Sequence, residues 1–222
     1  MRYQTSVART TWFTIFLRLL VIVGYVASYP LAFKLPVKWS WENQFIENAQ
    51  AGVLLVGFLL ALYFAFKAPK RSCSWFWLMI APIWFILFAR ELSWGAVFLE
   101  PSSMDVLTGP IFSSSRLWYK SVVYPCVGGL ALCCLCIFVL SKQYHTLARL
   151  WRWRGFPVLE MVLAVFGALL STAAEGHGGL VLPGGLGHGQ AQIVEELSEL
   201  FVYIAIFAAQ WRVYICFKRQ SS

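Results

Sequence analysis

The chain has 222 residues, of which 59% are hydrophobic and only 13% charged, and its formal net charge is +8. This composition is too apolar for an ordinary soluble domain. Basic loops beside anionic lipid explain the positive charge without a nucleic-acid partner, so the composition predicts an integral membrane protein in a lipid bilayer.

Six apolar stretches are long enough to cross a hydrocarbon core, which takes about 20 residues in a helix. They are continuous and lack the period-two alternation of membrane β-barrels. The expected helices cover residues 12–33, 46–66, 75–98, 119–141, 157–175 and 192–215. We therefore predict a single all-α transmembrane domain over residues 1–222, a polytopic bundle of six transmembrane helices.

Basic residues concentrate before the first expected helix, between the second and third, between the fourth and fifth, and after the sixth. They are Arg2, Arg9, Lys67, Lys70, Arg71, Lys142, Arg149, Arg152, Arg154, Lys218 and Arg219. Six spans place these four segments on one side, which the positive-inside rule assigns to the cytoplasm. We expect both termini there and the opposite helix ends to face outward.

The second expected helix begins with three polar residues, Glu47, Asn48 and Gln50. Glu47 and Gln50 are three positions apart, so they share one face of a helix. Polar groups at membrane depth are costly and normally face a bundle interior or a cavity. We expect these three residues to belong to a buried polar cluster.

The third expected helix carries Arg90 and Glu91 near its outer end. If the helix continues to Phe98, Arg90 lies roughly 12 Å below that end, given a rise of about 1.5 Å per residue. A charge at that depth needs a partner. We expect Arg90 to pair with Glu91, Glu196 or Glu199 in the bundle interior.

Residues 90–95 read RELSWG. This segment resembles the E-[I/L]-S-W-G element of uncharacterised bacterial multi-span inner membrane proteins, which also carry acid-rich later helices. The resemblance covers about six residues and the general layout. It implies a multi-pass protein of the bacterial inner, or plasma, membrane, and it implies no activity.

The last two expected helices bring further acids to the same side. Glu175 ends the fifth helix and His177 follows it, while Glu195, Glu196 and Glu199 begin the sixth. Carboxylates with an imidazole suit hard or borderline divalent metals. The cofactor stays open: a divalent cation fits, with Glu175, His177, Glu195 and Glu199 as its ligands, and the alternative is that these acids form structural pairs or contact headgroups and water. Residues 176–190 contain seven glycines and form either a flexible or a re-entrant connection.

Three functions are compatible with this pattern. The preferred one is cation or proton handling, including transport, at an outward-facing acidic intramembrane site. The first alternative is a membrane-embedded metal-dependent hydrolase of lipid or peptide; Glu195-Glu196 resembles the glutamate pair of CAAX-type proteases, but that family's arginine after the pair is missing. The second is a non-catalytic subunit or assembly factor with membrane-protein partners, or a homo-oligomer. No catalytic residue is indicated, which favours a protein that is not an enzyme.

Overall fold

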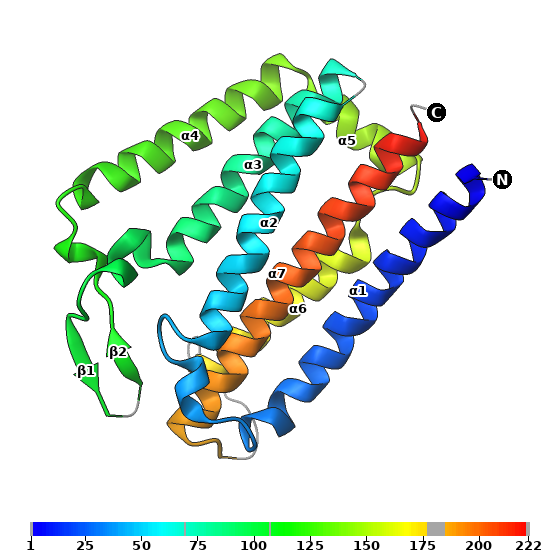
Figure 1. Ribbon diagram of the computed structural model, residues 1–222. Helices are drawn as coiled ribbons and strands as arrows, with labels where there is room; N and C mark the ends of the chain where they lie inside the picture. Colours follow the sequence, from blue (N-terminus) through cyan, green and yellow to red (C-terminus); the bar gives the residue numbers. More distant parts are fainter. Residues whose placement is uncertain (1, 69, 107, 177–184, 221–222) are drawn as a thin grey trace. The chain divides into compact units, whose positions relative to one another are not determined.

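The computed structural model describes residues 2–68, 70–106, 108–176 and 185–220, with side chains from Trp12 onward (Figure 1). Six helical segments are long and apolar enough to cross a membrane, which confirms the predicted all-α architecture of a multi-pass membrane protein. The elements in chain order are α1 (Arg2–Ala32), η1 (Val37–Ser40), α2 (Phe45–Lys67), α3 (Arg71–Glu91), η2 (Ser93–Phe98), β1 (Ser103–Asp105), β2 (Gly109–Ile111), η3 (Ser114–Arg116), α4 (Lys120–Leu140), α5 (Gln143–Arg152), α6 (Val158–Glu175) and α7 (His188–Arg219).

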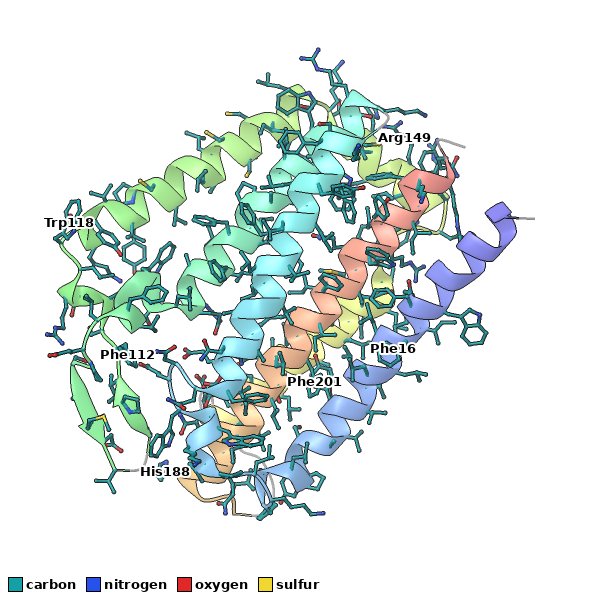
Figure 2. The ribbon with its side chains drawn as sticks, in the orientation of Figure 1. Phe16, Phe112, Trp118, Arg149, His188 and Phe201 are labelled. Atoms are coloured by element: carbon teal, nitrogen blue, oxygen red, sulfur yellow. The ribbon has the colours of Figure 1, made fainter. Side chains whose placement is uncertain are left out.

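Many large apolar side chains on these helices point away from the protein, as expected for helices in lipid. Phe16 on α1 is 58% exposed and Trp118, just before α4, is 91% exposed (Figure 2). A lipid tail is as apolar as these side chains, so burying them in protein brings no hydrophobic gain in a membrane.

The chain forms two compact units. Unit 1 comprises Met1–Gln50, Asp105–Gly109 and Pro157–Ile215, and unit 2 comprises Ala51–Met104, Pro110–Phe156 and Cys216–Ser222. Unit 1 therefore contains α1, the first residues of α2, α6 and most of α7. Unit 2 contains the rest of α2, together with α3, α4, α5 and the end of α7.

Unit 1 is held together by close packing of α1, α6 and α7. Val21 and Tyr25 of α1, Ala164 of α6 and Ala205 of α7 form one buried apolar cluster. Glycine makes this closeness possible: a Cβ on Gly167 would lie 2.1 Å from the Tyr25 hydroxyl. We call Val21, Tyr25, Ala164 and Ala205 the apolar layer.

Unit 2 has an aromatic core. The Trp77 ring of α3 lies 5.1 Å from Phe64 of α2 and 5.9 Å from Phe217 at the end of α7, between ring centroids. Trp84 packs directly onto Gly57, where a Cβ would come within 2.6 Å of the indole. The deep tryptophans of α3 are therefore packing residues.

The third helix is shorter than expected. It ends at Glu91, and residues 93–98 form the separate 3₁₀ segment η2. Ser93, Trp94 and Gly95 have positive φ angles of 45°, 58° and 98°, which an α-helix does not accommodate. Hydropathy alone did not indicate this break, because the residues that follow Glu91 are mostly apolar.

Two further elements were not expected from the sequence. The stretch between the fourth and fifth expected spans contains the short helix α5, which buries Gln143, Thr146 and Leu150. These positions recur every three to four residues, so α5 rests on unit 2 by one face. In addition, β1 and β2 form a two-stranded sheet in the connection between α3 and α4.

Candidate functional site

The start of α2, the end of α6 and the start of α7 meet at one end of unit 1 (Figure 1). Their buried apolar residues pack in one cluster that includes Ile46, Ala174, Val194 and Leu197. Each of these residues is next in sequence to a glutamate. The apolar contacts of these residues therefore bring four carboxyl groups to the same end, and Glu199, four positions after Glu195, adds a fifth near them. The five groups belong to Glu47, Glu175, Glu195, Glu196 and Glu199, and we call them the acidic cluster.

Gln50 connects α2 to α7 beneath this cluster. Its side chain is fully buried, and its Nε2 donates to the backbone oxygen of Glu196 at 2.8 Å and to Oε2 of the same residue at 2.9 Å. Gln50 Oε1 is buried and has no hydrogen-bond partner among the described residues. Buried polar atoms are normally paired, so this oxygen is available to a further donor at the base of the cluster.

The remaining carboxyl groups also contact one another or a polar neighbour. Ser171 of α6 donates to Oε1 of Glu199 at 3.2 Å. The carboxyl groups of Glu175 and Glu195 lie close to one another. A hydrogen bond between them would require one of the two to carry a proton, because an ionised carboxylate is an acceptor only.

Like charges surround these groups. The Glu195 carboxyl lies near those of Glu175 and Glu199, and the Glu196 carboxyl lies near those of Glu195, Glu199 and Glu47. Coulomb repulsion between neighbouring carboxylates disfavours a fully ionised cluster and favours the binding of a proton or of a metal cation. The structure thus brings Glu47, Glu175, Glu195, Glu196 and Glu199 to one end of unit 1, while Glu91 belongs to unit 2.

Asn48 differs from the expectation of a buried position. It is exposed, and its Nδ2 donates to the backbone oxygens of Asn43 and Gln44 at 3.0 and 2.8 Å. The Gln44 oxygen also accepts the Asn48 backbone N–H at 2.9 Å, so the side chain adds further bonds at the start of α2. Asn48 therefore stabilises the entry to α2 and lies outside the buried polar cluster.

Arg90 and Glu91 belong to unit 2. Arg90 Nη2 lies 3.1 Å from Oε1 of Glu91, which is buried, while the Arg90 side chain is 56% exposed. The expected helix end at Phe98 is wrong: α3 ends at Glu91, so Arg90 lies at a helix end and is exposed. The expected pairing with Glu91 is present.

The proposed metal ligands are only partly described. His177 lies outside the described residues, and Glu175, Glu195 and Glu199 lie in the acidic cluster. Among the described residues, no group of three or more histidine, cysteine, aspartate or glutamate side chains has an arrangement that could hold a metal ion. The cluster, as described, is a set of hydrogen-bonded carboxyl groups and not a preformed coordination shell.

The sequence interpretation missed a second charged site in unit 1. Glu160 of α6 is fully buried, and its Oε1 accepts from Nε and Nη2 of Arg18 at 2.9 and 2.6 Å. Arg212 Nη1 of α7 lies 3.7 Å from the same oxygen. We call Arg18, Glu160 and Arg212 the ion triad. The sequence did contain a signal for this site. Arg18, Glu160 and Arg212 lie on the same half of three expected helices, and the glutamate has the opposite charge to the two arginines.

The two charged sites lie toward opposite ends of unit 1. Glu160 and Glu175 are 15 positions apart on α6, which corresponds to about 22 Å along the helix. The apolar layer lies between them, with Ala164 following Glu160 by one helical turn. This packed layer separates the acidic cluster from the ion triad.

The chain matches no family model, and comparisons with curated proteins and with solved structures find no match. Inferences about function therefore depend on the geometry of these sites.

Proposed function

We propose that this chain is an integral membrane protein that handles protons and cations at its acidic cluster. The juxtaposition of the Glu175 and Glu195 carboxyl groups within the acidic cluster carries this proposal. The two groups lie on different helices, so a proton shared between them would be held at a junction between α6 and α7. Protonation of this pair changes the attraction between the two helices.

A divalent cation is the natural competitor for that proton. Carboxylate oxygens are the ligands that calcium, magnesium and manganese prefer, and a cation relieves the repulsion among several carboxylates. The ligands must be deprotonated to bind it, so cation binding releases protons and weakens as the pH falls. The protonated cluster and the cation-bound cluster are therefore alternative states of the same site.

The cluster faces outward under the charge distribution of the loops, and the termini then lie in the cytoplasm. The resemblance of residues 90–95 favours the bacterial inner membrane as the location. The packed apolar layer means that passage of an ion toward the ion triad requires α1, α6 and α7 to separate. We infer that binding at the cluster is the first step and that any transport includes such a movement. No observation on the described residues favours hydrolysis.

The test is a thermal-shift series on the detergent-solubilised full chain with calcium, magnesium, manganese and zinc, at neutral and acidic pH. A cation that binds the folded state raises the melting midpoint by mass action. We expect at least one ion to do so at neutral pH, and we expect the increase to shrink in acid.

The matched variants are Glu195→Gln with Glu199→Gln, and Glu100→Gln as the control. Glu100 is an exposed acid of unit 2, outside the cluster. The double variant should abolish the cation-induced shift and the control should retain it. A shift that survives in the double variant would place cation binding elsewhere, and no shift with any ion would remove cations from the proposal.

A further inference from the structure

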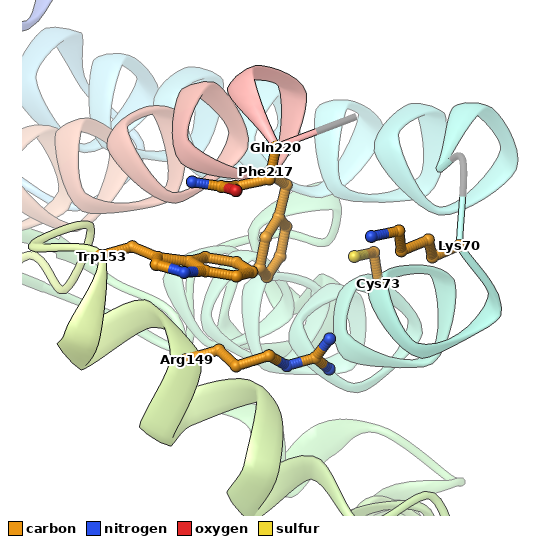
Figure 3. Close-up of a pocket in the computed structure, with 6 residues that line it drawn as sticks. All are labelled: Lys70, Cys73, Arg149, Trp153, Phe217 and Gln220. Atoms are coloured by element: carbon orange, nitrogen blue, oxygen red, sulfur yellow. The ribbon is translucent and has the colours of Figure 1, made fainter. Parts of the chain in front are cut away.

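A small pocket lies in unit 2, where α3 begins, α5 passes and α7 ends (Figure 3). Its empty volume is about 260 Å³, including the open mouth. The enclosed part has room for about one water molecule, so a phosphate group would sit at the mouth of the pocket. The lining residues are Lys70, Cys73, Arg149, Trp153, Phe217 and Gln220.

The polar part of the lining is cationic and donates hydrogen bonds. In Figure 3 the side chains of Lys70 and Arg149 extend toward the same space from different elements. Arg149 uses Nε and Nη2 on the His145 oxygen and the Thr146 hydroxyl, at 3.3 and 3.1 Å. Its Nη1 and the Lys70 ammonium make no hydrogen bond with the residues that the structure describes. Both groups are therefore available to an acceptor.

The described residues that line the pocket include no acidic side chain to balance these charges. The segments that build it, residues 67–73, 142–156 and 216–222, contain no aspartate or glutamate at all. A guanidinium with a free Nη1 and a lysine ammonium on one cavity are suitable donors to a phosphate group.

The rest of the pocket is apolar and aromatic. Phe217 is buried at one side of the pocket. The centroid of the partly exposed Trp153 ring lies 6.0 Å from the Arg149 guanidinium carbon, which stands over the ring. Such rings favour the headgroup region of a membrane. Basic pockets between helices on the cytoplasmic side bind anionic lipid headgroups. We propose that this pocket binds the phosphate group of an anionic phospholipid or of a soluble phosphate ester.

The test separates these two sources of phosphate. The detergent-solubilised full chain is titrated with phosphatidylglycerol, with phosphatidylcholine of the same acyl chains, and with inorganic phosphate. Retained lipid is counted by native mass spectrometry and the melting midpoint is followed in parallel. A response to phosphatidylglycerol alone assigns the pocket to lipid, and an equal response to inorganic phosphate assigns it to a soluble ester.

Variants identify the pocket as the place of binding. Arg149→Gln and Lys70→Gln should each weaken phosphatidylglycerol binding about fivefold, the factor equivalent to about 1 kcal/mol per basic residue near an anionic surface. Arg149→Lys keeps the charge and should give an intermediate loss, because it lacks the planar fork. The control is Arg152→Gln, a change at an exposed position on α5 that does not line the pocket.

The midpoint of each variant without lipid shows whether it is folded, and the lipid-induced shift is read relative to that value. The proposal is overturned if phosphatidylcholine binds as well as phosphatidylglycerol. It is also overturned if Arg152→Gln weakens binding as much as Arg149→Gln, since a diffuse basic rim would then explain the affinity.

Discussion

Glu160→Gln tests the ion triad without changing side-chain volume. The carboxylate accepts two charge-assisted hydrogen bonds from Arg18 through one oxygen, and each such bond contributes about 1.5–3 kcal/mol. Removing one partner of a buried pair costs about 3–5 kcal/mol. The Arg18 and Arg212 side chains are 23% and 29% exposed. Their partial solvation lowers the expected loss to about 3 kcal/mol.

The assay is denaturant-induced unfolding of the purified chain in mixed micelles, with Arg18→Gln and the double variant completing a cycle. Because the two residues share their interaction, the double variant should cost less than the sum of the single ones by at least about 1 kcal/mol. Glu100→Gln is the control and should remain within about 0.5 kcal/mol of wild type, as an exposed substitution. A free energy of unfolding for Glu160→Gln within that same margin would refute the triad as a stabilising contact.

Three further outcomes are expected. Gly167→Ala should destabilise unit 1 by about 1–3 kcal/mol in the unfolding assay, because the new Cβ would collide with the Tyr25 hydroxyl. Gly128→Ala is the control and should be tolerated, because its Cβ would meet no atom within 4 Å. Gln50→Ala should cost about 1–3 kcal/mol in that assay, because Glu196 loses a buried donor; a wild-type midpoint would contradict this. A reporter fused at the C-terminal end should be active in the cytoplasm, and periplasmic alkaline phosphatase activity would rule out an even number of spans.

The sequence predicted the six spans because hydrophobic length is a strong signal in a membrane protein. The helix count also placed the start of α2, the end of α6 and the start of α7 on one side, which is where five of the six glutamates of the expected cluster lie in unit 1; the sixth, Glu91, belongs to unit 2. The end of α3 could not be predicted in this way. The left-handed conformations of Ser93 and Trp94 depend on local packing, with Tyr119 donating to the Trp94 oxygen at 2.7 Å.

The surroundings of individual charges were harder to predict than the spans. Arg90 was expected in the interior because it was counted from Phe98, whereas the helix ends at Glu91. The pairing of Arg18 with Glu160 joins residues 142 positions apart, and a sequence without known helix neighbours does not specify such a contact. Hydropathy reports how deep a residue lies, and helix packing decides which residue it meets.

The most direct test of the central claim is infrared difference spectroscopy of the carboxyl groups, in H₂O and D₂O. A shared proton between Glu175 and Glu195 predicts a protonated carboxyl C=O band at neutral pH that shifts on deuteration. This band should disappear in Glu195→Gln, which can still donate to Glu175, and persist in Glu100→Gln. An unchanged spectrum in Glu195→Gln, or a spectrum of ionised carboxylates alone at neutral pH, would contradict the proposal that the acidic cluster holds a proton.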